Sequence, residues 1–294
     1  MTTPTDPARS SVERFLDDFH SRYPSATSSI FGEAPAGDRG SSYDLLLEIV
    51  PAGPAPITVL DLACGDGFLL ERLAARRQPG LRLIGVDLCA ADLRIAGERL
   101  GGGGATLLCE RAQAMSVPDA SVDVVLCHMA LMLMDDVEEV IASVGRVLRP
   151  GGVFSAVVGG GGIPVGGAFE VFVELIRGAF AEDAGARLQI GDPRTRSREG
   201  LEGLLGGGAG FEAPLEARDV VVRLDAPPAA LWRALSLTYD VDLLSAEGRA
   251  RTEAAFLEAA AARAREDGTV ACSLGLRQVT CRKARMPRPE DRRR

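Results

Sequence analysis

The sequence predicts an α/β protein built on a mostly parallel sheet, and three observations support this. Short apolar runs alternate with helical segments of about ten residues between residues 57 and 158. A glycine-rich turn, Asp61 to Gly67, separates the first apolar run from the helical pattern that follows it. Pro150-Gly151-Gly152 ends the last of these helices before another apolar run. Strands alternating with helices form βαβ units, whose strands run parallel.

The elements are expected in the following order. A helical cap occupies residues 1–54, where Ser10-Ser11-Val12-Glu13 is a capping box and Phe15 and Phe19 share the apolar face of the helix. A polar loop and a second short helix follow, and prolines end that helix. The next strands are expected over residues 57–60, 81–86, 105–109, 122–126 and 153–158, with helices over 68–76, 91–100 and 135–148.

Beyond residue 158 the pattern is less regular. Helices are expected over residues 169–180, 197–205, 227–237 and 250–265, and strands over 220–224 and 270–281. This arrangement places an insertion between the last strands. We therefore predict one domain over residues 55–283 with C-terminal lid elements, and a disordered basic tail over 284–294.

Composition excludes several kinds of protein. The net charge of −8 argues against a nucleic-acid binder, which needs basic surface. Six scattered cysteines without CxxC spacing, and two histidines, argue against a metal site or a disulfide framework. The first eleven residues lack the apolar core of a signal peptide, and the uncharged stretch 150–169 is too rich in glycine for a membrane span. We expect a cytoplasmic protein without metal, nucleic-acid or membrane partners.

The glycine-rich turn indicates a ligand site. Gly65 and Gly67 permit a tight turn and close approach of a ligand to the backbone. A dinucleotide site needs a third small residue for close helix packing, and here that position is Leu70. Asp87 ends the second apolar run, where a carboxylate accepts hydrogen bonds from a ribose diol or caps the next helix. The pattern favours a nucleoside ligand without phosphates.

Four segments carry a resemblance to a known family. Residues 59–67 and 85–87 resemble the first two motifs of class I S-adenosylmethionine (SAM)-dependent methyltransferases. Residues 111–123 resemble the third motif, and 148–152 the turn before the fifth strand. The branch with ubiquinone and menaquinone methyltransferases and natural-product tailoring enzymes is the most similar. The resemblance implies a Rossmann-like seven-stranded sheet with its last strand antiparallel, helices on both faces, and SAM as co-substrate.

The resemblance also implies roles for individual residues. Asp61 would orient the glycine turn and, through water, the methionine amine of SAM. Ala63, Gly65 and Gly67 would contact the methionine moiety. Asp87 would bind the ribose, and Leu88 and Ala112 would contact the adenine. The chain departs from the family at Arg111, where an aspartate usually accepts from the adenine amino group and an arginine cannot. We hypothesise that the Gln113 amide oxygen replaces it, with Arg111 facing solvent.

Two histidines are candidates for catalysis on the acceptor side. His128 follows the fourth apolar run, at the sheet edge where ligands bind, and a neutral histidine there accepts a proton or plays a structural or binding part. His20 ends the first helix and is the second candidate, although methyl transfer often needs only alignment of the reactants. The candidate acceptor-binding residues are Tyr23, Tyr43, Met129, Trp232 and Tyr239.

These observations predict methyl transfer from SAM to a small organic acceptor, a specialised metabolite, at oxygen before carbon or nitrogen. Two alternatives stay open. The first is methylation of a peptide carboxyl or side chain. The second is a protein that keeps the SAM fold for cyclisation or binding. A homodimer is compatible with the sequence.

Overall fold

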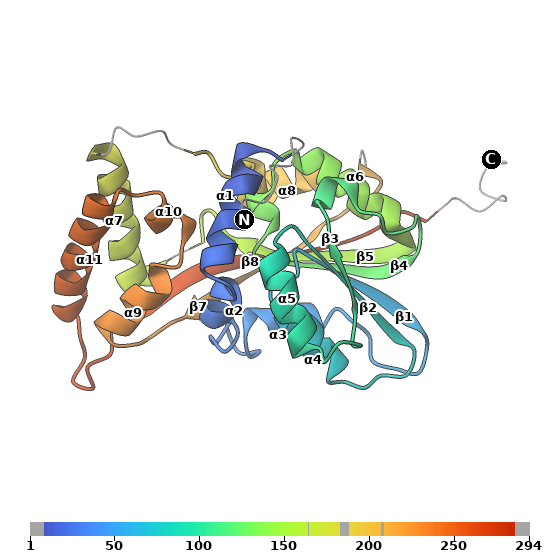
Figure 1. Cartoon of the computed structure of the whole chain (residues 1–294), viewed down its shortest axis with the longest axis horizontal. Coiled ribbons are helices and arrows are strands. Elements are labelled where there is room, and N and C mark those ends of the chain that lie inside the picture. Colours follow the sequence, from blue (N-terminus) through green and yellow to red (C-terminus); the bar gives the residue numbers. More distant parts are fainter. Residues whose placement is uncertain (1–8, 164, 183–187, 207–208, 286–294) are drawn as a thin grey trace.

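The computed structural model describes residues 9–163, 165–182, 188–206 and 209–285, and a single mixed sheet runs through it (Figure 1). The strand order is β3-β2-β1-β4-β5-β8-β6, with β7 also paired to β8. The first five strands are parallel and β8 is antiparallel to its neighbours. The strands are β1 Ile57–Leu62, β2 Leu81–Asp87, β3 Thr106–Cys109, β4 Val122–His128, β5 Leu148–Gly159, β6 Gly166–Gly167, β7 Glu216–Arg223 and β8 Cys272–Arg282.

The long strand β8 explains how eight strands fit a seven-position sheet. Leu276 pairs with both Gly159 of β5 and Val220 of β7, so these two strands lie on opposite edges of β8. Ser273 pairs with both Arg223 of β7 and Gly166, so the two-residue β6 continues the β5 edge. The predicted Rossmann-like sheet with an antiparallel last strand is confirmed.

Both faces of the sheet are covered by helices. Neighbouring residues of β1 point to opposite faces, because successive side chains of a strand alternate. Val59 packs in a core with α3 (Ser42–Leu47), α4 (Phe68–Ala74) and α5 (Ala90–Arg99). Leu60 packs in the other core, with α6 (Val137–Val147) and α8 (Arg198–Leu205). This burial on two sides fits the continuous apolar run of the strand.

The first two N-terminal helices lie at the carboxyl ends of the parallel strands, whereas α3 packs on one face of the sheet. The capping box predicted for the first helix is present at α1 (Ser11–Arg22), with reciprocal bonds between Ser10 and Glu13. The following segment was predicted to be a polar loop, and this is wrong. It forms the short helix α2 (Ala26–Phe31), because burial of its two apolar ends outweighs the weak helix propensity of the residues between them.

The segments around β7 form an outer lobe, on the left of Figure 1. It contains α7 (Ala168–Glu182), α9 (Pro228–Leu235), α10 (Tyr239–Asp242) and α11 (Ala246–Ala261). The predicted insertion between the last strands corresponds to α9, α10 and α11. Short 3-10 helices also form at η1 (Ala112–Ala114), η2 (Leu131–Leu133) and η3 (Pro193–Arg196).

Two findings concern the membrane-spanning potential of the helices and the C-terminal tail. None of their helices is long and apolar enough to cross a membrane. The tail predicted over 284–294 lies outside the described residues from 286 onward.

Candidate functional site

The turn after β1 bends sharply because three of its residues have left-handed backbone conformation. Ala63, Gly65 and Gly67 have φ values of 57°, 51° and 76°. Such values are unusual for a residue with a Cβ, so Ala63 is held there by its surroundings. A Cβ added at Gly67 would lie 2.8 Å from the Cβ of Ala96, so this glycine permits close packing of α4 and α5. Ala63 and Gly65 line a pocket, and Gly67 does not.

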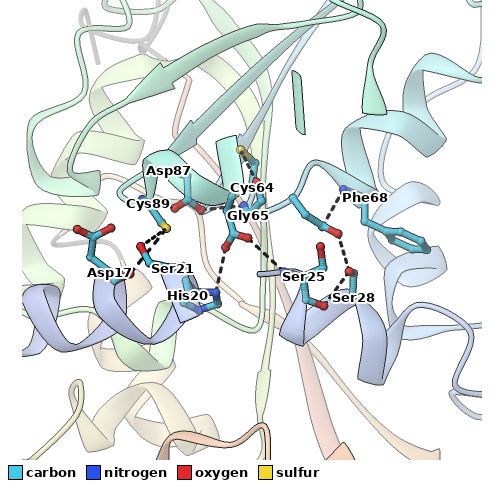
Figure 2. Close-up of polar contacts among 12 residues, drawn as sticks. Asp17, His20, Ser21, Ser25, Ser28, Cys64, Gly65, Phe68, Asp87 and Cys89 are labelled. Atoms are coloured by element: carbon cyan, nitrogen blue, oxygen red, sulfur yellow. Dashed lines mark hydrogen bonds and ion pairs between the residues drawn. The ribbon is translucent and has the colours of Figure 1, made fainter. Parts of the chain in front are cut away.

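Asp87 fixes this turn and begins the next helix at the same time. Its Oδ2 accepts a hydrogen bond from the Gly65 N–H, and its Oδ1 accepts one from the Cys89 N–H, each at 2.8 Å (Figure 2). Cys89 is the N-cap residue of α5. Burial raises the pKa of Asp87, and the two backbone donors oppose that rise. Each carboxylate oxygen can accept a further bond, so the group remains able to bind a diol.

Leu70, the bulky residue that argued against a dinucleotide, is accommodated by a glycine on the neighbouring strand. Leu70 is fully buried. A Cβ added at Gly85 of β2 would lie 2.7 Å from the Cδ1 of Leu70. Helix α4 therefore packs closely against the sheet because Leu70 fills the space that a side chain at Gly85 of β2 would occupy.

A first pocket opens between this turn, the ends of β2 and β4, and α1. Its empty volume, including the part open to solvent, is about 850 Å³. Six carboxylates line it: Glu13, Asp17, Asp87, Asp92, Glu110 and Asp135. Arg111 is the only arginine or lysine among the described lining residues, so the pocket favours a cationic ligand.

A second, mostly apolar pocket adjoins the first. Its empty volume is about 1250 Å³ including open solvent, and its charged lining residues are Arg196 and Asp240. Its apolar walls come from α1, α2, the β5–β6 connection, α7, α9 and β8. The two pockets share four lining residues: Thr27, Met129, Leu133 and Tyr239.

Three residues predicted to cradle an adenine, Leu88, Ala112 and Gln113, line the first pocket. Gln113 donates from Nε2 to the Asp135 carbonyl at 2.8 Å, which leaves its amide oxygen as an acceptor. We expected Arg111 to face solvent, but its side chain is partly buried in an ion pair. Its Nε donates to Glu13 Oε1 at 2.7 Å and joins the loop after β3 to α1.

His128 lines the first pocket in a buried setting without charge. Its Nε2 lies 2.9 Å from Ser42 Oγ, and its ring stacks on Tyr43 at 3.7 Å. Burial lowers the pKa of His128 to about 3. Its Nδ1 is buried and has no hydrogen-bond partner among the described residues. Because an imidazole with so low a pKa holds a proton poorly at neutral pH, this site suits binding better than proton transfer.

His20 has the opposite environment. Its Nδ1 lies 3.0 Å from Asp92 Oδ2, and its Nε2 lies 2.9 Å from the Tyr239 hydroxyl. Burial acts to lower the pKa of His20, but the carboxylates of Asp92, Asp87 and Asp17 outweigh it, so the pKa is raised. Asp92 was missed by sequence reasoning, because an acid in the first turn of a helix is the usual choice there and signals nothing more.

The remaining candidates fall at different distances from the pockets. Met129 and Tyr239 line both pockets. Tyr43 stacks on His128, and the half-buried Tyr23 packs on Phe19. Neither tyrosine lines the first or the second pocket.

Trp232 and Asp61 are also absent from the lining. Trp232, expected at the acceptor site, is buried in the outer lobe with Phe172 and Phe256, because an aromatic cluster forms the core of those helices. Asp61 is buried below the turn, and burial raises its pKa well above the ordinary value. Among the described residues, no group of three His, Cys, Asp or Glu side chains could hold a metal ion.

Comparison with known proteins places the site in context. Residues 60–156 match a methyltransferase domain family. The malonyl-[acyl-carrier protein] O-methyltransferase of Methylococcus capsulatus is 32% identical over 130 residues, which is 42% of this chain and 47% of that protein. The chain spans about half the length of the curated relatives it matches.

Two solved structures share the fold. The [4+2]-cyclase SpnF aligns with a TM-score of 0.56 at 17% identity, over 95% of this chain and 98% of that one. A Haemonchus contortus N-methyltransferase in complex with phosphomonomethylethanolamine and S-adenosylhomocysteine aligns with a TM-score of 0.55 at 18% identity, over 95% and 61%. At these identities the likeness concerns the fold alone.

Proposed function

We propose that this chain, which carries a class I SAM-dependent methyltransferase domain, transfers a methyl group from SAM in the first pocket to a small acceptor in the second. One observation carries the proposal: the two pockets meet at Thr27, Met129, Leu133 and Tyr239. A sulfonium in one pocket can therefore face a nucleophile in the other. SAM supplies an activated methyl group, and alignment of the reactants provides much of the acceleration.

The first pocket fits SAM by the chemistry of its groups. Asp87 offers carboxylate oxygens to a ribose, and the open turn at Ala63 and Gly65 offers backbone to a methionine moiety. The free amide oxygen of Gln113 offers an acceptor to an adenine amino group. The surrounding carboxylates favour the sulfonium and ammonium charges.

The second pocket supports an acceptor that is mainly apolar. Its size exceeds that of the first pocket, and its walls are mostly aliphatic and aromatic. We propose a specialised metabolite methylated at oxygen, with carbon and nitrogen next. The Methylococcus capsulatus relative is named for O-methylation of an acyl-carrier-bound malonyl group, which supports oxygen. The overall charge of −8 supports a small molecule over a nucleic acid.

Calorimetry and mass detection test the proposal together. Binding of SAM and S-adenosylhomocysteine is measured first. The protein is then incubated with SAM and a panel of apolar phenols, enols, carboxylic acids and peptides. A product heavier by one methyl group is expected. No uptake of either compound at millimolar concentration would overturn the proposal.

The sequence leaves one second candidate open, a reaction without methylation, and the fold is shared with a protein named as a [4+2]-cyclase. The same incubation separates the two. A product of unchanged mass, formed whether or not SAM is replaced by S-adenosylhomocysteine, would support cyclisation.

A further inference from the structure

Three polar side chains from three separate elements form a chain of contacts at the junction of the two pockets. Asp92 belongs to α5, His20 to α1 and Tyr239 to α10. Asp92 Oδ2 lies 3.0 Å from His20 Nδ1, and His20 Nε2 lies 2.9 Å from Tyr239 Oη. Figure 2 shows His20 directed from α1 toward the corner that Gly65 and Asp87 form.

The carboxylate fixes which nitrogen of His20 carries the proton. An ionised carboxylate only accepts hydrogen bonds, so the nitrogen that faces Asp92 must be protonated, although the pair makes an ion-pair contact and not a hydrogen bond in this conformation. In the neutral imidazole Nδ1 is then the donor and Nε2 the acceptor. The Tyr239 hydroxyl therefore donates to Nε2, and its own lone pairs remain available.

The three groups reach the two pockets unequally. Asp92 and His20 line the first pocket only, and Tyr239 lines both. A molecule in the second pocket thus reaches the phenol oxygen directly and reaches His20 through it. This order makes Tyr239 the link between an acceptor and the imidazole.

The surrounding contacts hold the chain of groups together. The Tyr239 ring packs on Phe19 with centroids 4.7 Å apart. Two bonds of 2.8 and 2.7 Å from Arg22 to Asp242 tie α1 to α10. The Ser25 N–H donates to Asp92 Oδ1 at 3.2 Å.

The charged groups that act on His20 are all acidic: Asp17 on α1, Asp87 on β2 and Asp92 on α5. They favour an imidazolium once a proton arrives.

We propose that Tyr239 and His20 remove the proton of an acceptor hydroxyl during methyl transfer, with Asp92 as the positioning residue. The acceptor oxygen forms a bond to the methyl carbon, and the carbon–sulfur bond of SAM breaks with its electron pair staying on sulfur. The acceptor proton passes to the Tyr239 oxygen as the Tyr239 proton passes to His20 Nε2. This deepens the proposed function by naming the acceptor class, a hydroxyl compound that must lose a proton.

The pKa directions agree with this order. Burial and the carboxylates of Asp87 and Asp92 raise the pKa of Tyr239, so the phenol stays protonated and can relay. The raised pKa of His20 makes it a better proton acceptor, provided that it is neutral at the start. The rate should therefore rise with pH as His20 loses its proton.

Nuclear magnetic resonance tests the arrangement without any acceptor. The chain has two histidines, so ¹⁵N-histidine labelling gives two imidazoles, assigned with His128→Gln. We expect neutral His20 to carry its proton on Nδ1 and to titrate above the ordinary value. Replacing Asp92 with Asn should shift the proton toward Nε2. An Nε2-protonated ring in the unmodified protein would overturn the inference.

Kinetics with an acceptor found in the mass screen test the chemistry. His20→Gln can still bond the phenol but cannot take up a proton, and should lower kcat about 10²- to 10⁴-fold. Tyr239→Phe keeps the aromatic packing and should also lower kcat strongly. Tyr23→Phe removes a hydroxyl from a tyrosine that lines neither pocket, and is the matched control.

Two further readouts separate a proton relay from a structural role. SAM affinity should be little changed in Tyr239→Phe, and the acid limb of the pH–rate profile should coincide with the His20 titration and vanish in His20→Gln. If both variants methylate at the unmodified rate, the relay is refuted and methyl transfer stands. If SAM does not bind at all, the proposed function fails, and the histidine spectrum still decides the geometry.

Discussion

The two pockets share four residues but differ in charge and in origin. The first is lined by six carboxylates and is built mainly from consecutive strand ends of the central sheet. The second is mostly apolar and is built from segments far apart in the chain, such as α2, α9 and β8. The difference teaches that the first pocket depends on local backbone geometry, whereas the second depends on how distant elements pack.

The two histidines also differ in the charge of their surroundings. His128 lies between Ser42 and Tyr43 and has its pKa lowered to about 3 by burial. His20 faces Asp92, and its pKa is raised. The pKa values of the two histidines therefore shift in opposite directions, because one environment is apolar and the other is anionic.

Replacing Asp87 with Ala should give the largest difference between ligand binding in the first pocket and ligand binding in the second. The carboxylate holds Gly65 and Cys89 and, in our proposal, a ribose. Charge-assisted bonds are worth about 1.5–3 kcal/mol each, so loss of two should weaken SAM binding roughly 10²- to 10⁴-fold. Calorimetry measures the affinity, and apolar acceptor binding to the second pocket should persist.

Asp123→Ala is the matched control for that change. Asp123 also accepts a backbone hydrogen bond, from Thr58 at 2.8 Å, but at the amino end of β1 and away from both pockets. Equal loss of SAM affinity in the two variants would mean that Asp87 acts through general stability, and not as a ligand.

The apolar setting of His128 predicts a pH dependence of stability. Its folded pKa of about 3 lies below the ordinary 6.5, so below about pH 6.5 only the unfolded chain takes up this proton. Stability should therefore fall as pH falls. Between about pH 7.5 and 5, the unmodified protein should lose about 2 kcal/mol more unfolding free energy than His128→Gln. Urea denaturation measures this, and identical losses in the two proteins would contradict the assignment.

The second pocket can be weakened without touching the first. Leu237 lines the second pocket only. Shortening it to Ala removes apolar contact worth about 1–2 kcal/mol, so acceptor affinity should fall roughly 5- to 30-fold. Leu237→Met retains the volume and should behave like the unmodified protein. A parallel loss of SAM affinity, measured by calorimetry, would show that the pockets are not separable.

The sequence predicts the first pocket better than the second for the same physical reason. The residues 61–67 turn and Asp87 are set by strand ends and helix starts, which short patterns reveal. The parallel pairing of β1 to β5 could also be predicted, because strands that alternate with helices form βαβ units. The antiparallel last strand was implied only by the resemblance to a known family. Packing between distant segments leaves no such pattern.

Particular residues show where prediction stops. Trp232 is aromatic and lies in the insertion, yet it serves the core of the outer lobe. Tyr239, seven positions later, reaches both pockets because α10 turns back onto α1. Asp92 resembles an ordinary first-turn acid until the fold brings His20 against it. Such roles arise from tertiary contacts between residues that are not neighbours in the chain.

The smallest effect concerns the contact between α1 and Arg111, the position where the chain departs from the family it resembles. Glu13 accepts from Arg111 at 2.7 Å and also from the Ser10 N–H at 2.9 Å. Glu13→Gln keeps the capping box, since glutamine serves there as well, but removes the ion pair. Because α1 forms one wall of the first pocket, we expect SAM to dissociate a few-fold faster, a change of up to about 1 kcal/mol. Stopped-flow fluorescence with Arg111→Ala and the double variant completes a cycle, and additive effects would show that the pair does not hold this wall in place.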